Sequence, residues 1–122
     1  MARILVVDDN AMMRSVMRIA LQRAGHDVTI AEDGTRALAA FGTGGSFDLI
    51  ITDMEMPRLD GRGLVEALRR ATCASPVVVI SGRYGESELA RMAAGESPSV
   101  QGSLEKPFTA ERLISKVSEM LG

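Results

Sequence analysis

Charged residues stand directly after short apolar runs at three places in the sequence. Asp8 and Asp9 follow the first run, Asp53 ends the second and Lys106 follows the third. If the three runs are neighbouring parallel strands, these side chains meet at one edge of one sheet. Two carboxylates ~4 Å apart repel by roughly 4 kcal/mol at an effective dielectric constant of about 20, so three together need a cation among them. A hard divalent ion with oxygen ligands, Mg²⁺ above all, is expected there, with Lys106 adding a second positive charge.

Asp53 occupies the place of an attacking group in this pocket. A carboxylate beside a divalent ion can act as a nucleophile toward phosphorus and form an acyl phosphate. Ser81 ends another apolar run and offers its hydroxyl to a phosphoryl oxygen, and Gly82 lets its backbone N–H approach closely. Lys106 would contribute a point charge. These residues predict a pocket that accepts a phosphoryl group.

Apolar stretches of two kinds alternate along the chain. Short runs rich in branched residues predict buried parallel strands, and stretches with apolar residues every three or four positions predict amphipathic helices. Strands are expected over residues 3–7, 28–31, 48–52, 76–80 and 100–105, and helices over residues 11–24, 34–41, 61–72 and 86–94 and after Thr109. This alternation predicts one α/β domain of the flavodoxin-like, doubly wound type, with a five-stranded parallel sheet in strand order 2-1-3-4-5. Ligands of such folds bind at the carboxyl ends of the strands, where the acidic residues fall.

The composition limits the classes of partner. The 122 residues suit one domain, and 14 basic against 16 acidic residues give a net charge of −2. This charge provides no positive field for nucleic acid or acidic membrane surfaces, so neither is expected as a partner. The longest apolar run is strand-sized, far from the ~20 residues that cross a bilayer. With a single cysteine and no secretory signal at the amino terminus, a protein of the reducing cytoplasm is expected.

Several short motifs, in the expected order, resemble the receiver domain of two-component response regulators. They are Asp8-Asp9, Asp53 with Met56-Pro57 and Asp60-Gly61, Ser81-Gly82, and Lys106-Pro107-Phe108. One pair of aspartates is unspecific, whereas this ordered set spans the chain and predicts one receiver domain over residues 1–122, which is expected to be of the stand-alone type. The resemblance implies a phosphoacceptor signalling domain, which is not an enzyme beyond its own phosphorylation and dephosphorylation. Asp53 would accept the phosphoryl group from a sensor histidine kinase, a histidine phosphotransfer protein or a small phosphodonor, and an unidentified downstream protein would respond.

The resemblance also implies the metal ligands. Asp9, Asp53 and the backbone carbonyl of Glu55 would bind Mg²⁺, and Asp8 would act mainly through a bound water. Asp60 is interpreted instead as a turn and capping residue for the third helix.

The residues that would hold the phosphoryl group follow from the same resemblance. Ser81 and the backbone amides of Glu55 and Gly82 would bind its oxygens, and Lys106 would pair with it. Lys106-Pro107 resembles the family's cis peptide, which an X–Pro bond adopts at modest cost in free energy.

Ser103 departs from the family pattern, in which Phe or Tyr stands three residues before the lysine. That ring normally moves inward together with the hydroxyl residue, so the usual aromatic switch cannot operate here. The segment between Ser81 and Lys106 is also longer than usual, and residues 95–99 break its helical pattern. An altered or mobile fourth helix is therefore expected.

Glu55 and Arg83 carry opposite charges at two positions close to the predicted phosphorylation site. They stand two residues after Asp53 and Ser81, positions that flank the path of hydrolytic water in the family. Because their charges are opposite, we hypothesise that the two side chains meet above the phosphoryl group and lengthen its lifetime on Asp53.

Three other functions stay open. The chain could pass the phosphoryl group on as a phosphorelay shuttle, or be a degenerate receiver that serves only as a binding module. An aspartyl-phosphate phosphatase shares the Asp nucleophile and Mg²⁺ but needs that Asp on the first strand, whereas Asp53 falls on the third. His26 and Cys73 are interpreted as surface residues, and the arginines of the first helix, such as Arg14, as a solvated face or a docking site for the kinase.

Overall fold

The computed structural model of the chain describes residues 2–44, 46–56, 59–71, 73–83 and 100–122. Its elements, in chain order, are β1 (Arg3–Val7), α1 (Ala11–Arg23), β2 (Asp27–Ala31), α2 (Gly34–Gly44), β3 (Leu49–Asp53), α3 (Gly61–Arg70), β4 (Val77–Ser81), β5 (Gly102–Glu105) and α5 (Ala110–Leu121). All strand pairs are parallel, and the sheet has five strands in the order β2-β1-β3-β4-β5. The predicted flavodoxin-like fold is thereby confirmed.

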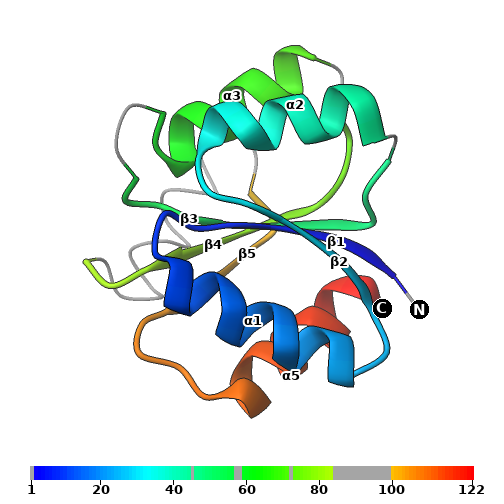
Figure 1. Cartoon of the computed structure of the whole chain (residues 1–122), viewed down its shortest axis with the longest axis vertical. Coiled ribbons are helices and arrows are strands. Elements are labelled where there is room, and N and C mark those ends of the chain that lie inside the picture. Colours follow the sequence, from blue (N-terminus) through cyan, green and yellow to red (C-terminus); the bar gives the residue numbers. More distant parts are fainter. Residues whose placement is uncertain (1, 45, 57–58, 72, 84–99) are drawn as a thin grey trace.

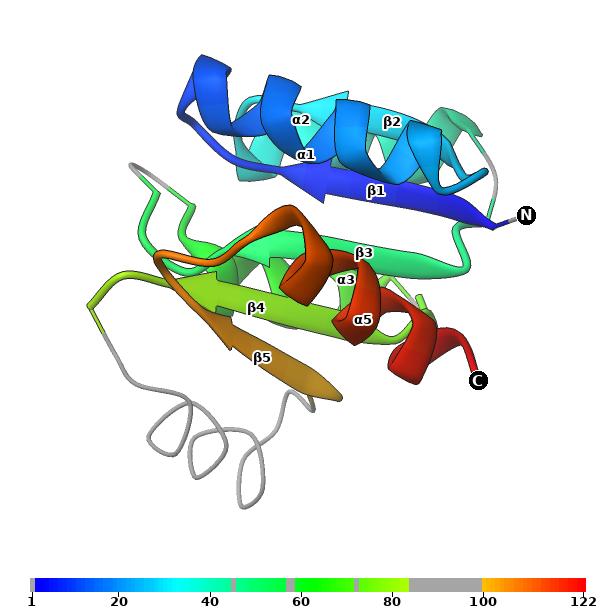
Figure 2. The ribbon, with the colours of Figure 1, turned by 90° about the horizontal axis from the view of Figure 1, so that it is seen from below.

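The sheet lies between two layers of helices (Figure 1). Helices α2 and α3 cover one face and contact each other, and α1 and α5 cover the opposite face. On that second face α1 packs on β1 and β2, while α5 packs on β3 and β5 (Figure 2). Both faces of the sheet are therefore covered, which is why its strands are apolar without polar alternation.

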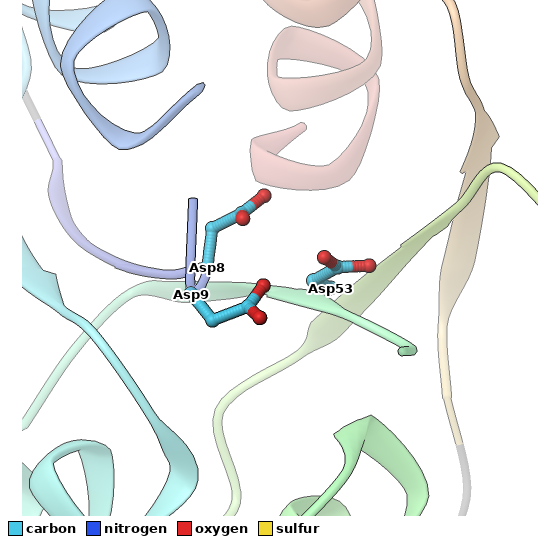
Figure 3. A group of neighbouring side chains, drawn as sticks. All are labelled: Asp8, Asp9 and Asp53. Atoms are coloured by element: carbon cyan, nitrogen blue, oxygen red, sulfur yellow. The ribbon is translucent and has the colours of Figure 1, made fainter. Parts of the chain in front are cut away.

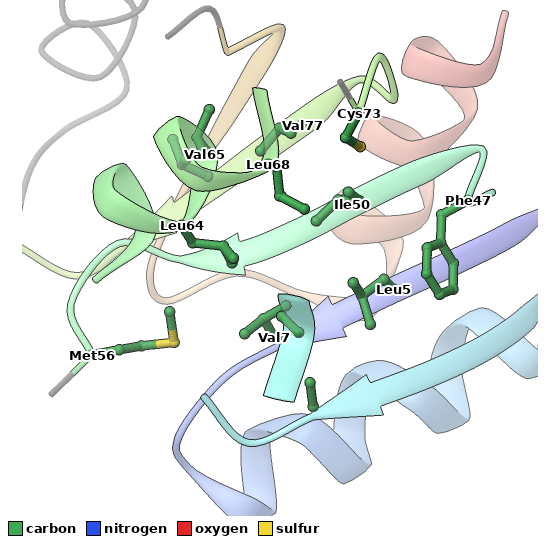
Figure 4. Close-up of a cluster of buried hydrophobic side chains, with 13 residues drawn as sticks. Leu5, Val7, Phe47, Ile50, Met56, Leu64, Val65, Leu68, Cys73 and Val77 are labelled. Carbon is green, nitrogen blue, oxygen red and sulfur yellow. The ribbon is translucent and has the colours of Figure 1, made fainter. Parts of the chain in front are cut away.

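Each face of the sheet carries its own apolar core, because successive residues of a strand point to opposite faces. Under α2 and α3 the buried side chains include Leu5, Ile50, Ala37 and Leu68 (Figure 4). Under α1 and α5 they include Ile4, Ile51, Met17 and Leu113. Burying a large aliphatic side chain contributes about 1.5–3 kcal/mol, and a slip of one residue would exchange the two faces. The two cores thus hold the strands in register.

The register of β1 and β3 places two acidic residues side by side. Val7 pairs with Thr52, and Asp8 and Asp53 each follow one residue later. The backbone N–H of Asp8 extends the ladder on its other side by donating to the carbonyl of Ala31. The carboxyl ends of β1 and β3 therefore place the carboxylates of Asp8 and Asp53 at the same edge of the sheet.

The register of β4 and β5 does the same for the lysine. Ser81 pairs with Glu105, and the backbone N–H of Lys106 then donates to the carbonyl of Ser81 over 2.7 Å. The peptide bond between Lys106 and Pro107 is cis, as expected. Lys106 consequently enters the same edge of the sheet from the side opposite to Asp8.

Side-chain caps begin the described helices, and at α2 the cap is Asp33, whose carboxylate accepts from a backbone N–H of the first turn. Asn10 accepts from the backbone N–H of Met13 at the start of α1, and Asp60 accepts from Gly63 at the start of α3. Thr109 caps α5 in the same way. Each cap satisfies an N–H that has no partner within its helix. The predicted capping role of Asp60 is confirmed, and the last helix begins after Thr109 as expected.

Helices α2 and α3 end at different places than expected. Helix α2 continues to Gly44, although the glycines after Phe41 predicted a loop. A glycine in a helix is only about 1 kcal/mol less favourable than alanine, so the packing of Ala37 and Phe41 against the core outweighs it. Helix α3 ends at Arg70, two residues early. There the Arg69 guanidinium donates to the backbone carbonyl groups of Cys73 and Ser75, beyond the end of the helix.

Cys73 is not a surface residue. It is 3% exposed and belongs to the core under α2 and α3, because the chain turns inward after α3. The expected helix over 86–94 and the break over 95–99 lie outside the described residues. Within those residues, every helix is too short or too polar to cross a membrane.

Candidate functional site

Three carboxylates gather at the carboxyl edge of the sheet. Asp8 and Asp9 follow β1, and Asp53 ends β3. One carboxylate oxygen of each lies within 4.8 Å of the others (Figure 3). Asp8 is fully buried and Asp53 is 4% exposed, whereas Asp9 faces solvent. The group therefore forms a cup of oxygen ligands that opens to solvent at Asp9.

The buried Asp8 carboxylate is only half satisfied. Its Oδ1 accepts from the backbone N–H of Asn10 over 2.9 Å. Its Oδ2 is buried and has no hydrogen-bond partner among the described residues, and Lys106 Nζ approaches it only to 3.7 Å. An unpaired buried carboxylate oxygen is unfavourable, and a hard divalent cation is the kind of partner that it would satisfy. The donor set of these aspartates fits such an ion.

Lys106 is the cation that the structure places in the cup. Its Nζ donates to Asp53 Oδ2 over 3.1 Å. Burial alone would lower the pKa of Lys106, but the Asp53 and Asp8 carboxylates together raise it, so the ammonium stays charged. One ammonium therefore faces the two buried carboxylates of Asp8 and Asp53.

This positive charge does not balance the acids. Burial raises the pKa of Asp8, and burial together with the Asp8 charge raises the pKa of Asp53, in both cases against the opposing effect of Lys106. Ionised Asp8 and Asp53 are thus less favourable here than in water. The single ammonium of Lys106 does not offset the negative charge of the carboxylates in the pocket. This agrees with the repulsion among the aspartates that the sequence predicts.

The backbone after Asp53 is shaped by a close contact with Gly61. A Cβ atom at Gly61 would lie 2.6 Å from the backbone oxygen of Asp53 and 2.9 Å from the Cα of Met54. The Gly61 N–H donates to the carbonyl of Met54. Only glycine permits this approach. The backbone N–H of Glu55, two residues after Asp53, donates to Asp53 Oδ1 over 3.2 Å.

A second group of donors lies beside Asp53. Ser81 ends β4 and Gly82 follows it, and the Ser81 hydroxyl and the Gly82 backbone N–H both point to the Glu55 side chain. The Ser81 hydroxyl donates to Glu55 Oε2 over 2.7 Å, and the Gly82 N–H donates to Oε1 over 3.2 Å. We call these two donors the oxygen cradle. A hydroxyl and a backbone N–H held together in this way suit the oxygens of an anion.

The structure brings the seven predicted site residues together at one edge of the sheet. They are Asp8, Asp9, Asp53, Glu55, Ser81, Gly82 and Lys106. Their chemical roles stay predictions, since these contacts give positions and not reactions.

Glu55 has other partners in the structure than Arg83, with which it was expected to pair. Glu55 bonds to the oxygen cradle, and the Arg83 side chain is exposed with its backbone N–H donating to Ser81 Oγ.

Arg14 belongs to the surroundings of the site, so its interpretation as part of a solvated helix face is wrong, while the alternative of a docking site for the kinase stays a prediction. It is half-buried, and its guanidinium donates to the backbone carbonyl of Asp8 over 2.7 Å. This bond ties the first turn of α1 to the end of β1. The signal in the sequence is a basic residue one turn into the helix that directly follows Asp8 and Asp9.

Comparison with known proteins gives a consistent set of relatives. The model of the response regulator receiver domain family matches residues 4–118. Response regulator MprA of Mycobacterium sp. strain KMS is 34% identical over 119 residues, an alignment that covers 98% of this chain and 50% of MprA. The chain thus spans about half the length of the curated relatives that it matches.

Solved structures agree with these relatives. The chemotaxis response regulator CheY4 of Vibrio cholerae has a TM-score of 0.88 and 32% identity, with 99% of each chain covered. NtrX from Brucella abortus has a TM-score of 0.86 and 35% identity, with 98% of this chain and 27% of NtrX covered. Both similarities extend over the whole fold and its carboxyl edge.

Proposed function

The chain belongs to the response regulator receiver domains of two-component signalling, and from this premise we propose that Asp53 accepts a phosphoryl group in a Mg²⁺-dependent reaction. The observation that carries the proposal is the position of the Asp53 carboxylate. It is buried beside Asp8, Asp9 and Lys106, with the oxygen cradle alongside. A carboxylate held among opposing charges and anion donors is suited to attack phosphorus.

The acidic cup would hold the Mg²⁺ ion. Its ligands would be Asp9, Asp53 and the backbone carbonyl of Glu55, with Asp8 acting mainly through a water. The support is the oxygen donor set within 4.8 Å and the unpartnered Oδ2 of Asp8. When bound, the ion supplies positive charge that offsets the repulsion among the carboxylates and the incoming phosphoryl oxygens.

The chain's own residues would then hold the transferred group. One Asp53 oxygen forms the new bond to phosphorus while the bond from phosphorus to the donor's nitrogen or oxygen breaks, and the donor keeps that electron pair. The Ser81 hydroxyl and the N–H groups of Glu55 and Gly82 bind phosphoryl oxygens, and Lys106 pairs with their charge. The reaction is the chain's own modification, so it is not an enzyme with a separate substrate.

The donor would be a sensor histidine kinase or a histidine phosphotransfer protein in the cytoplasm, and the output would be changed contacts with a downstream protein. The phosphoryl group adds about two negative charges at the edge of the sheet, enough to shift a two-state equilibrium. No nucleic acid or membrane takes part in this proposal, in keeping with the net charge of −2.

A phosphorelay shuttle is the second candidate, and Ser103 is the observation that favours it. This residue lies on β5, is 9% exposed and replaces the aromatic ring that usually couples phosphorylation to the surface. A shuttle needs reversible transfer at Asp53 but no such ring. Transfer of label from the phosphorylated chain to a histidine phosphotransfer protein would favour the shuttle.

The test of the proposed function is labelling with acetyl phosphate and Mg²⁺, followed by intact-protein mass spectrometry. We expect a mass increase of one phosphoryl group in the wild type and none in Asp53→Asn, which keeps the shape of the side chain. Continuous phosphate release beyond one equivalent would instead indicate a phosphatase. A wild type that gains no phosphoryl group would indicate a binding module.

A further inference from the structure

The side chain of Glu55 lies on the donors that a phosphoryl group would use. Its Oε2 accepts from the Ser81 hydroxyl over 2.7 Å, and its Oε1 accepts from the Gly82 N–H over 3.2 Å. Each carboxylate oxygen thus takes one of the two donors in the oxygen cradle. The side chain is half-buried in this position. The cradle is therefore filled by an anionic group of the chain itself.

The direction of the Ser81 hydroxyl supports this description. The backbone N–H of Arg83 donates to Ser81 Oγ over 3.0 Å, so the serine oxygen accepts on that side. The serine hydroxyl donates its own hydrogen to Glu55 Oε2 over 2.7 Å, which is shorter than its bond from Arg83. Hydrogen bonds to an ionised acceptor are roughly twice as strong as those between neutral groups. Serine therefore has a defined partner before any phosphoryl group arrives.

The position of Glu55 in the chain explains why it can reach the cradle. Its backbone N–H lies 3.2 Å from Asp53 Oδ1, so its backbone is held next to the phosphoacceptor. From there its side chain has the length needed to span to β4, whose last residue is Ser81. The carboxylate resembles part of a phosphoryl group in chemistry, because it offers two anionic oxygens to the same donors.

From these contacts, and on the basis of the proposed function, we propose that the Glu55 carboxylate is an internal competitor for the oxygen cradle. The side chain must leave the Ser81 hydroxyl and the Gly82 N–H before these donors can bind the oxygens of an incoming phosphoryl group. Glu55 therefore sets how readily Asp53 is phosphorylated. If the cradle is filled by Glu55 for about nine tenths of the time, the apparent affinity for a phosphodonor falls about tenfold.

Two substitutions separate occupancy of the cradle from the negative charge of Glu55. Glu55→Asp keeps the charge, but its carboxylate is one methylene closer to the backbone and loses its reach to Ser81 and Gly82. Glu55→Ala removes both the charge and the reach. Glu66→Gln removes one exposed negative charge from α3 and serves as the control. If charge alone mattered, Glu55→Asp would behave as the wild type.

The experiment measures initial rates of labelling by acetyl phosphate below saturation, with Mg²⁺ saturating for every variant. Amide hydrogen exchange at Gly82, without a phosphodonor, provides a second reading. We expect Glu55→Asp and Glu55→Ala to be labelled about tenfold faster than the wild type and to lose about tenfold of the protection at Gly82. Glu66→Gln should match the wild type in both measurements.

The outcomes distinguish this inference from the proposed function. If the wild type is labelled but Glu55→Asp is labelled no faster, or Gly82 keeps its protection, the competitor role of Glu55 is wrong and the function of Asp53 stands. If no variant and no wild type is labelled, the phosphoacceptor function itself is overturned, and the role of Glu55 with it. Faster labelling of Glu55→Asp together with loss of Gly82 protection supports both.

Discussion

The ammonium nitrogen of Lys106 lies 3.1 Å from Asp53 Oδ2, although the two residues are 53 positions apart in the sequence. The strand order brings them together. Asp53 ends β3 and Lys106 follows β5, and β4 lies between these two strands. The distance is therefore fixed by sheet pairing rather than by a loop. Under the proposed function, this cation would offset the negative charge of the Asp53 carboxylate before modification and that of the phosphoryl group after it.

Lys106→Ala is expected to slow the labelling of Asp53 by acetyl phosphate about 100-fold, because it removes an ammonium in contact with the acceptor. Quenched time courses read by mass spectrometry measure the rate. Lys116→Ala is the matched control, since Lys116 pairs with Glu119 on α5. Equal rates for Lys106→Ala and Lys116→Ala would show that the ion pair with Asp53 has no part in the transfer.

Asp8→Asn is expected to stabilise the protein by about 1 kcal/mol at pH 7 in buffer without divalent cations. Burial raises the pKa of Asp8, so the native state binds this proton more tightly than the unfolded chain, and the ionised form opposes folding. The wild type therefore loses stability as the pH rises from the ordinary carboxyl pKa of 3.8 through the raised native value. Urea unfolding across this range provides the measurement.

The gain from Asp8→Asn should disappear below pH 3.8, where Asp8 is protonated in both states. Asp27→Asn, which changes an exposed carboxylate at the start of β2, is the matched control. An Asp8→Asn variant less stable than the wild type at pH 7 would mean that the ionised Asp8 supports folding after all.

Mg²⁺ is expected to raise the thermal midpoint of the wild type. At ten times its dissociation constant it adds about 1.4 kcal/mol, or roughly 5 °C for a domain of this size, because it binds the native acidic cup and not the unfolded chain. Asp9→Asn should require a higher Mg²⁺ concentration for the same shift, while Asp27→Asn should follow the wild type. Scanning calorimetry with and without a chelator tests this, and an Asp9→Asn curve that overlays the wild type would contradict the assignment of Asp9 as a ligand.

Gly61→Ala is expected to destabilise the protein by about 2 kcal/mol and to slow labelling of Asp53. Its Cβ would meet the Asp53 backbone oxygen at 2.6 Å, so the backbone that carries the acceptor must shift. Gly42→Ala is the control, since a Cβ there meets nothing within 4 Å and lies within α2. That variant should gain about 0.5–1 kcal/mol in urea unfolding. If Gly61→Ala were as stable as the wild type and labelled equally fast, the contact with Asp53 would not shape the site.

The strand order and the site edge could be predicted from the sequence because both follow from a few strong signals. Apolar runs define the strands, right-handed crossovers restrict their order, and charged residues at strand ends must then meet. These signals place Asp8, Asp53 and Lys106 together at one edge of the sheet. Details that depend on packing were harder to predict. Cys73 became buried because of how the chain leaves α3, and no periodic pattern marks that turn.

The partner of Glu55 shows why side-chain contacts within a site are harder to predict than its position. Opposite charge favoured Arg83, but a surface ion pair contributes little and orders two long side chains. The Ser81 hydroxyl and the Gly82 N–H lie within reach and offer two directed hydrogen bonds to one carboxylate. Which donors lie within reach of a rotamer is decided by the three-dimensional arrangement of β4 and the loop after β3, and the spacing of residues does not encode it.

The central claim is that Asp53 receives the phosphoryl group, and chemical trapping of the acyl phosphate tests it most directly. The chain would be treated with acetyl phosphate and Mg²⁺, reduced with borohydride, which converts a phosphorylated aspartate to homoserine, and mapped by peptide mass spectrometry. We predict homoserine in place of Asp53 alone, and none when Mg²⁺ is removed by a chelator. Reduction at Asp8, at Asp9 or at no aspartate would contradict the claim.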